Sequence, residues 1–527
     1  MSEDTNQTTD EKQNYLRQNI LDKGYDGNEF INFLIEKKGE DGADVSNWSF
    51  PDLKAVVKEF ISLNSQKTTE NYEKENKENE LYGIKNIKEI TCQTIPSNEI
   101  TKCENIQIKI DSFEKVKGNN IFTKSYATYL ITTMPFDWKV RRRFSDFEWL
   151  HQILSQDYKY CLIPSIPKKK NINKLVTDKF DEAFLRKRSR KFEKFLSYVL
   201  NDPILKNTNV IYEFLSIEKE EDFQKKKKTY EKKKPSSNIN INDFITIDGR
   251  ANIEINNEKE NNFKNIKENA YNNGAILKKI NSKINSCKDD LINAANKLKE
   301  ISQNWNKMKN LAITEMDDVI KTYEELSSMF DNLSLYISKL NYIIYVYLRE
   351  YFKYVKNNYH SMKELISVGE NIKNNFNKSL KHLKSKKEDL YKKPESINKW
   401  EYNPEENIDT NELVKNKELA LEKMLYNETN EVNKQKQVYG FYLNRVISEY
   451  ERMKEINAEM HLATVLKIFE KQTDATTDFI TSLADNSTDL TISRKDAKNI
   501  KKEKKTRKED DEEILDLEIK KEKENKK

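Results

Sequence analysis

The chain has 527 residues, enough for two to four domains, and its 36% hydrophobic and 34% charged residues indicate long solvated helices beside a limited compact part. Its 93 basic and 88 acidic residues nearly cancel, to a formal net charge of +5, which excludes a global basic field of the kind that binds nucleic acid. Any basic site must therefore be local.

The compartment follows from the cysteines and from the start of the chain. The four cysteines include no C-x-x-C pair, and the polar segment Met1–Asp10 has no signal-peptide pattern. We therefore expect a reducing cytosolic environment without disulfides. The longest charge-free apolar helical stretch is Leu340–Leu348, which is too short to cross a bilayer, so any membrane contact would be at the surface.

Residues 11–64 are predicted to form a small helical unit. Leu16 and Ile20 lie four residues apart, and Ser49–Asp52 is a helix start followed by apolar residues on one face. Two interpretations remain open: a docking module for a partner, or a small bundle that packs on the rest of the chain. Residues 65–100 are rich in Glu, Lys and Asn and are interpreted as a linker.

Residues 101–217 are predicted to be a globular α+β domain with a three-stranded sheet. Strand character is found in Ile106–Asp111, Ser125–Thr133 and Lys139–Phe144, with Gly118–Asn120 as a hairpin turn. Helices are expected over 145–157, over 178–201 and near 208–216. Strands followed by helices are typical of an α+β fold.

The stretch Lys139–Leu150, K-V-R-R-R-F-S-D-F-E-W-L, carries the strongest signal of a binding site. Three arginines end a strand, an aromatic residue follows, and Ser145 with Glu148 fits the S-x-x-E capping box of a helix start. A helix N-terminus beside guanidinium groups and an aromatic face favours an anionic ring compound, above all a sugar phosphate. The alternative is an amphipathic strand with a solvated basic edge.

Residues 218–260 are interpreted as a second linker with basic runs at Lys225–Lys228 and Lys232–Lys234. Within it, Asp243–Ile255 has some apolar content. This segment could lie along a membrane or pack back on the globular domain, and the sequence does not choose between the two.

From 261 to 486 the apolar residues repeat at intervals of three and four, which predicts heptad seams in three helices of roughly 50, 75 and 70 residues. Pro394 and Pro404 bracket the break between the second and third helices. The stretch Leu340–Val355 is apolar nearly all round, so we expect it to be buried on all sides in the six-helix centre of a dimer. The alternative is one thick monomeric bundle.

Residues 101–217 resemble the PX (phox-homology) domain. The resemblance is carried by R-R-F-S-D-F-x-x-L at Arg142–Leu150, by the P-x-x-P loop Pro164–Pro167 with following lysines, and by the helix Phe184–Leu196. Residues 261–486 are similar in helix pattern to a BAR domain, the three-helix elongated coiled coil. Together the two parts resemble the PX-BAR sorting nexins, with 487–527 as a disordered charged tail.

The resemblance implies a pocket for phosphatidylinositol 3-phosphate in the PX part. Arg143 would hold the 3-phosphate, Phe144 would pack under the inositol ring, and Arg188 would hydrogen-bond the 4- and 5-hydroxyls. Guanidinium groups suit a phosphate or a vicinal diol, in agreement with these roles. Arg142 is expected to face solvent or an acidic neighbour.

The loop after the prolines would complete the pocket. Lys169 would meet the 1-phosphate, with Lys168 and Lys170 as alternatives. The family's loop usually has adjacent prolines, whereas Ser165 follows Pro164 here, which predicts a more flexible loop. Three apolar residues after the lysines are expected to enter the membrane interface: Ile172, Leu175 and Val176.

The BAR-like part implies a homo- or heterodimer with basic residues toward anionic lipid. The candidates flank the proline break: Lys381, Lys384, Lys386, Lys387, Lys392 and Lys393. The alternative is an ordinary solvated helix end. In the tail, Ile514–Glu518 resembles a clathrin-box peptide, although such short motifs also arise by chance.

No H-E-x-x-H, P-loop or G-x-G-x-x-G motif appears, and the four histidines are far apart, so neither catalysis nor a metal or cofactor is expected. The resemblance implies a cytoplasmic protein, peripheral on early endosome membranes, that serves endosomal cargo sorting and retrograde transport. One rival is a coiled-coil scaffold or adaptor whose PX-like domain binds protein partners. Another is an enzyme-regulatory subunit that docks through 11–64.

Overall fold

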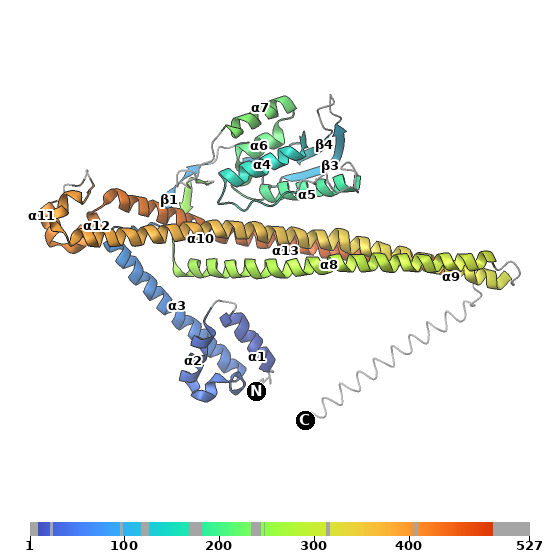
Figure 1. Cartoon of the computed structure of the whole chain (residues 1–527), viewed down its shortest axis with the longest axis horizontal. Coiled ribbons are helices and arrows are strands. Elements are labelled where there is room, and N and C mark those ends of the chain that lie inside the picture. Colours follow the sequence, from blue (N-terminus) through green and yellow to red (C-terminus); the bar gives the residue numbers. More distant parts are fainter. Residues whose placement is uncertain are drawn as a thin grey trace. The chain divides into compact units, whose positions relative to one another are not determined.

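The computed structural model (Figure 1) has two compact units, Met1–Lys278 with Tyr354–Glu459, and Lys279–Lys353 with Met460–Lys527. The structure describes residues 9–21, 25–94, 98–116, 126–167, 182–232, 244–246, 248–311, 317–403, 406 and 409–487. All four cysteines are free thiols.

The N-terminal helical unit forms as the sequence predicts. Its elements are α1 (Thr9–Leu16), a π-helical turn η1 (Arg17–Leu21), α2 (Gly27–Lys38), the 3₁₀ turns η2 (Glu40–Ala43) and η3 (Val45–Asn47), and α3 (Phe50–Leu81). Leu34, Leu53 and Phe60 lie in a hydrophobic cluster of this unit. The Ser49 side chain accepts a hydrogen bond from the Asp52 N–H and caps α3. Because α3 continues to Leu81, residues 65–81 are helical, and the prediction of a linker there is wrong.

The globular part is the predicted three-stranded sheet followed by helices. The strands β3 (Gln107–Val116), β4 (Tyr126–Met134) and β5 (Trp138–Arg143) pair antiparallel in the order β3-β4-β5. The helices are α4 (Phe144–Asp157), α5 (Glu182–Leu200), η5 (Leu205–Asn207) and α6 (Asn209–Ser216). Tyr129 from the sheet and Phe192 from α5 meet edge to face, with ring centroids 5.2 Å apart, in the core. The predicted turn Gly118–Asn120 lies outside the described residues.

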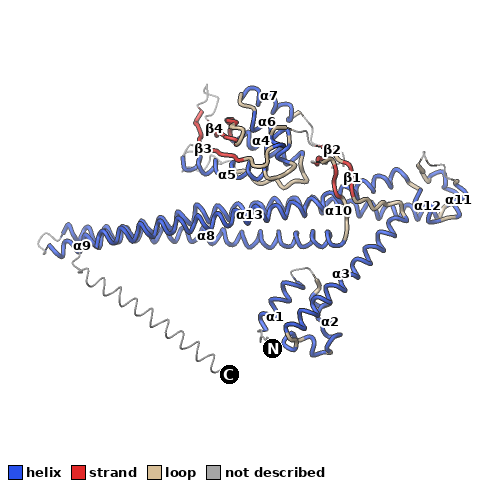
Figure 2. The backbone as a smooth tube through the Cα atoms, turned by 180° about the vertical axis from the view of Figure 1, so that it is seen from behind, coloured by secondary structure: helices blue, strands red, loops and turns tan. Residues whose placement is uncertain are grey.

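The segments before and after this domain pair with each other. Strand β1 (Glu89–Thr91) pairs antiparallel with β7 (Arg250–Asn252), and β2 (Gln93–Thr94) pairs parallel with β6 (Ile245–Thr246). Figure 2 shows β1 and β2 apart from β3 and β4. The turn η4 (Ile100–Lys102) and helix α7 (Glu220–Glu231) lie next to the domain in sequence.

In the apolar segment 243–255, the described residues 244–246 and 248–255 pack on protein, which favours packing over a position along a membrane. Phe244, Ile253 and Ile255 are buried, and the Phe244 ring stacks on Phe441 with centroids 3.8 Å apart. Much of the second predicted linker is therefore ordered structure.

Close approach of this segment to helix α13 (Tyr426–Ser487) requires a glycine at 440. A Cβ at Gly440 would lie 2.1 Å from the Ile253 carbonyl oxygen. We expect Gly440→Ala to destabilise the protein by about 1–3 kcal/mol, because the backbone must move apart, with a lower urea midpoint as the measurement.

A matched control exists at Gly369, also in a helix, where a Cβ would make an ordinary contact of 3.4 Å with Phe263. Gly369→Ala is expected to be neutral or stabilising by up to about 1 kcal/mol, since alanine favours helix. Equal midpoints for the two variants would contradict the close approach at Gly440.

The heptad region forms the three predicted long helical segments. The first segment is α8 (Asn257–Leu311). The second consists of α9 (Asp317–Ile343), a π-helical turn η7 (Ile344–Leu348) and α10 (Arg349–Tyr391). The third is α13, which follows three short elements: η8 (Pro394–Lys399), α11 (Thr410–Lys415) and α12 (Lys417–Lys423). The break at Pro394 is confirmed. None of the described helices is both long enough and apolar enough to cross a membrane.

In the unit Lys279–Lys353 with Met460–Lys527, segments of α8, α9 and α13 pack together. The Ser334 hydroxyl donates to the Ala295 carbonyl at 2.8 Å, and Tyr336 stacks on Phe479 at 4.8 Å. The stretch expected to be buried on all sides is not enclosed within one chain, because Tyr342 is 60% exposed.

Candidate functional site

Arg143 stands where β5 passes directly into α4. Its backbone N–H donates to Asp146 Oδ2 at 2.9 Å, so Asp146 satisfies the start of the helix. The predicted capping box of Ser145 and Glu148 is wrong. The strand runs without a loop into a helix that begins at Phe144, and the capping position therefore falls on Arg143.

The Arg143 side chain keeps hydrogen-bond donors unused. It is 37% exposed, and its guanidinium lies 5.5 Å from the Tyr126 ring centroid. Its Nε lies 3.6 Å from Asp146 Oδ1, beyond hydrogen-bond length, and has no acceptor among the described residues. The Arg143 guanidinium therefore lies beside Tyr126 and Asp146, and its Nε–H remains available to a ligand.

Arg188, on α5, is brought onto the aromatic residue next to Arg143. Its guanidinium lies between two rings, 4.4 Å from the Phe144 centroid and 4.5 Å from the Phe184 centroid. Its Nε is buried and also lacks an acceptor among the described residues. Burial raises the pKa of the nearby Tyr129 phenol, an effect that the positive charge of Arg188 opposes. Arg188 thus lies over Phe144, the residue that follows Arg143, and the lipid-binding roles of these three residues stay predictions.

Arg142 is fully buried, so the expectation that it faces solvent is wrong, whereas the alternative of an acidic neighbour fits the nearby Asp146 and Glu220. Alternation along β5 puts it with Val140 on the buried face. Its Nε donates to the Phe214 carbonyl at 3.1 Å and its Nη2 to the Ile217 carbonyl at 2.6 Å. Burial lowers the pKa of Arg142 to about 10. This arginine fastens α6 to the sheet.

The proline loop is described only as far as Pro167, and within it Pro164 is buried. The residues proposed for the 1-phosphate and for membrane insertion lie outside the described residues: Lys168, Lys169, Lys170, Ile172, Leu175 and Val176. The tail with Ile514–Glu518 also lies outside them. These expectations stay predictions.

One of the lysines near the Pro394 break is a structural residue. Lys387 is fully buried, and its Nζ donates to the carbonyls of Tyr82 at 2.9 Å and Leu421 at 2.8 Å. Burial lowers the pKa of Lys387 to about 7. Lys387 therefore joins the segment after α3 to α12, and its proposed role as a membrane contact is wrong.

The other lysines of this group lie nearer the surface. Lys384 pairs with Glu78 at 2.6 Å, Lys386 pairs with Glu428, and Lys392 pairs with Asp389 at 3.4 Å. Lys381, Lys392 and Lys393 are exposed.

Replacing Lys387 by methionine is expected to destabilise the protein by about 2 kcal/mol, because buried carbonyls lose their donor. Urea unfolding measures the loss. The control is Lys386→Met, whose partly exposed ion pair should contribute less than about 0.5 kcal/mol. Equal stability of the two variants would argue against the carbonyl contacts.

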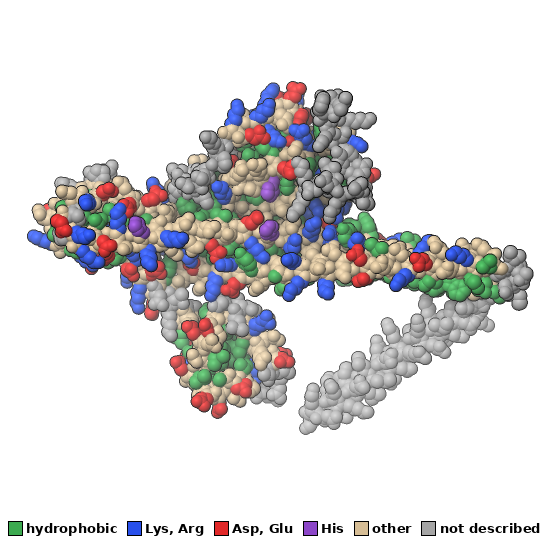
Figure 3. Space-filling model, in the orientation of Figure 1, with side chains coloured by type: hydrophobic (Ala, Val, Ile, Leu, Met, Phe, Trp, Pro, Cys, Tyr) green, Lys and Arg blue, Asp and Glu red, His purple; other side chains and the backbone are tan. Residues whose placement is uncertain are grey.

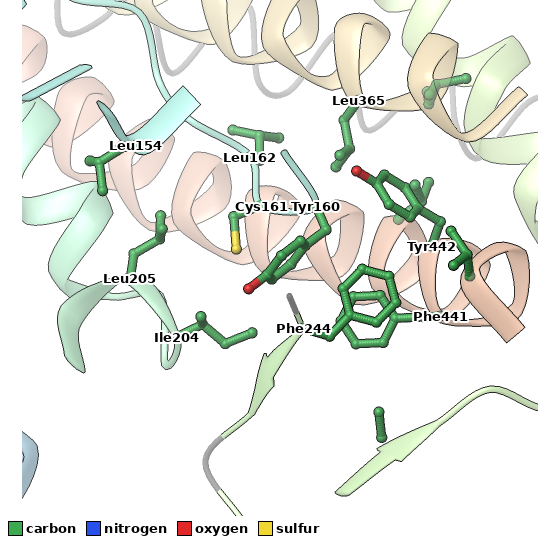
Figure 4. Close-up of a cluster of buried hydrophobic side chains, with 14 of the residues drawn as sticks. Leu154, Tyr160, Cys161, Leu162, Ile204, Leu205, Phe244, Leu365, Phe441 and Tyr442 are labelled. Carbon is green, nitrogen blue, oxygen red and sulfur yellow. The ribbon is translucent and has the colours of Figure 1, made fainter. Parts of the chain in front are cut away.

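A buried ion-pair network joins the globular domain to α13. Arg445 Nη2 donates to Asp202 Oδ2 at 2.7 Å and to the Cys161 sulfur at 3.3 Å, and it also pairs with Glu449. Arg452 Nη2 lies 2.5 Å from Glu449 Oε2 and 3.3 Å from Asp202 Oδ2. Figure 4 shows Cys161 beside the aromatic cluster of Tyr160, Phe244 and Phe441.

The two carboxylates of the network differ in their pKa. Although burial opposes ionisation, Arg445 and Arg452 lower the pKa of Asp202 to about 2. Burial and the adjacent Asp202 carboxylate raise the pKa of Glu449 to about 7, against the pull of the same arginines. Cys161, Asp202 and Glu449 approach one another as metal ligands would, but two guanidiniums already bond their oxygens, so the donors do not fit a cation.

Sequence reasoning missed this network. Its signal was present on α13, where Arg445, Glu449 and Arg452 follow at intervals of four and three residues on one helix face. Such charges are usually solvated, and their partner Asp202 lies more than 200 residues earlier in the chain.

The globular domain is similar in sequence to known proteins. A PX domain family model matches residues 131–218. Sorting nexin-4 of Eremothecium gossypii is 34% identical over 113 residues, which cover 19% of this chain and 27% of that protein. Sorting nexin-4 of Neurospora crassa is 34% identical over 106 residues, which cover 19% of this chain and 22% of that protein. The chain thus spans about a quarter of the length of these curated relatives.

Among solved structures, the cryo-EM structure of the SNX-BAR Mvp1 tetramer is similar to 73% of this chain and 99% of that chain, with 15% identity and a TM-score of 0.48. The family match and the α+β fold define residues 131–218 as a PX domain. With the long helices α8 to α13 behind that domain, the chain has the architecture of a PX-BAR sorting nexin.

Proposed function

We propose that this protein is a non-enzymatic, cytoplasmic sorting nexin that binds phosphatidylinositol 3-phosphate at the surface of early endosomes. Through its helical region it senses or induces membrane curvature, and it serves cargo sorting and retrograde transport. Clathrin, bound through Ile514–Glu518, is part of the same proposal.

One observation carries the lipid proposal. The Arg188 guanidinium lies over the Phe144 ring, and Arg143 directly precedes Phe144 in the chain; each has a buried Nε without an acceptor among the described residues. Such donors suit a phosphate and a vicinal diol, which an inositol 3-phosphate presents together. Lys169 in the adjoining loop would meet the 1-phosphate.

We also propose that the helical region forms a dimer, in which a second BAR-type region packs on the exposed apolar residues of the first. In the unit Lys279–Lys353 with Met460–Lys527, the large apolar side chains that are more than half exposed include Leu335, Tyr342, Leu462, Leu466, Phe469 and Ile480. Figure 3 shows apolar side chains on the surface near α9. Exposed apolar patches of this kind mark interfaces, so we propose a homo- or heterodimer. Two lipid pockets in one dimer would multiply a weak single contact.

Vesicle flotation of the full chain tests the lipid proposal. We expect flotation with vesicles that contain phosphatidylinositol 3-phosphate, and much weaker flotation with phosphatidylinositol or its 4-phosphate at equal charge. Equal flotation on all of them would contradict a 3-phosphate pocket. Light scattering tests assembly, and a monomer mass at micromolar concentration would overturn the dimer.

A further inference from the structure

Helix α7 lies beyond the stretch that the PX family model matches, yet it is packed against the domain. Phe223 of α7 is fully buried, 5.6 Å from the Trp149 ring and 3.9 Å below the Arg142 guanidinium. Lys227 follows one helical turn later and therefore lies on the same face. The family match ends at residue 218, so Lys227 is not part of the matched domain.

Lys227 and Arg143 share one buried carboxylate. Lys227 Nζ donates to Asp146 Oδ1 at 3.2 Å, and their side chains are 12% and 1% exposed. Arg143 Nε lies 3.6 Å from the same oxygen, and the Arg143 backbone N–H occupies Oδ2. Lys227 is thus the closer cation at Oδ1.

A buried carboxylate needs a cation or hydrogen bonds to offset its desolvation. While Lys227 supplies them, the guanidinium of Arg143 remains available to a ligand. Without Lys227, Asp146 would draw Arg143 inward and use its donors. We infer that Lys227 is a positioning residue that keeps Arg143 free for phosphate by holding Asp146. This inference rests on the proposed lipid function.

Calorimetric titration of the full chain with soluble dibutanoyl phosphatidylinositol 3-phosphate tests the inference without help from avidity. We expect Lys227→Gln to weaken binding about fivefold, and Lys227→Arg, which keeps the ion pair, to bind as wild type. Lys228→Gln removes the same charge from an exposed position on the same helix and should change binding less than about twofold.

The double variant Asp146→Asn with Lys227→Gln separates positioning from a general charge effect. The amide that replaces the Asp146 carboxylate keeps an acceptor for the Arg143 N–H but no longer attracts the Arg143 guanidinium. If Lys227 acts through Asp146, the double variant binds like Asp146→Asn alone. Additive effects, or an equal loss in Lys228→Gln, would overturn the inference.

Circular dichroism checks that each variant is folded. If Lys227→Gln does not fold, Lys227→Met keeps the apolar stem near Trp149 and takes its place. Arg143→Ala in the same titration separates the two proposals. Unchanged binding there contradicts the lipid pocket itself, whereas lost binding there with normal binding in Lys227→Gln contradicts only the positioning role.

Discussion

Arg143→Ala is expected to weaken binding to phosphatidylinositol 3-phosphate roughly 30- to 150-fold, equivalent to about 2–3 kcal/mol. The side chain offers a guanidinium that is held beside Tyr126 and Asp146 and keeps a buried Nε without an acceptor among the described residues. Charge-assisted, bidentate bonds to phosphate are stronger than neutral ones, and alanine removes them all. Titration with the soluble lipid gives the affinity, and vesicle flotation gives the consequence at a membrane.

The control is Arg141→Ala, two residues earlier on β5. Arg141 Nη2 pairs with Glu114 at 2.5 Å, so its loss changes net charge equally without touching the proposed pocket. We expect less than about a threefold effect there. Arg143→Lys should fall between the two, because an ammonium cannot bind phosphate bidentately. Equal losses of affinity in Arg143→Ala and Arg141→Ala would show that the lipid binds to a diffuse basic surface and not to a specific pocket.

Asp202→Asn is expected to destabilise the protein by about 3–5 kcal/mol, because it leaves two buried arginines opposite one carboxylate. The asparagine can still accept the N–H groups of Ile204 and Leu205, which bond Asp202 Oδ1 at 2.8 Å, so the charge is the main loss. The urea midpoint measures stability. Hydrogen exchange should also quicken around Arg445, where the domain is joined to α13.

Restoring the charge balance provides the control. In Asp202→Asn with Arg452→Met, Arg445 and Glu449 remain as one pair, and the methionine still packs near Tyr198, over which Arg452 now lies at 4.4 Å. The double variant should recover at least about 1 kcal/mol of the loss. A single variant as stable as wild type, or a double variant that is weaker still, would show that the charges are not coupled.

The sequence predicts the fold well where the pattern is local. Strand alternation, helix periodicity and Pro394 place the sheet, the helices and the main break. For Arg142, strand alternation already predicts burial, because Val140 two residues earlier lies on the buried face of the same strand. Lys387 and Asp202 could not be found in this way, since their partners come from distant segments and only tertiary packing buries them.

The aromatic stretch at Leu340–Val355 contains a feature that its sequence pattern does not reveal. The π-helical turn Ile344–Leu348 adds a residue to one turn, and one residue rotates a helix face by about 100°. Apolar residues then spread around the helix as its packed face changes direction. Within one chain the stretch is not enclosed on all sides, and its burial in the centre of a dimer stays a prediction.

The pairing of β1 with β7 and of β2 with β6 has an evolutionary consequence. The chain enters and leaves the PX domain at adjacent points, so the domain is connected as an insertion into the helical framework that follows α3. Domains with neighbouring termini tolerate transfer between hosts. A domain connected in this way could be exchanged for another without interrupting the helices that follow it.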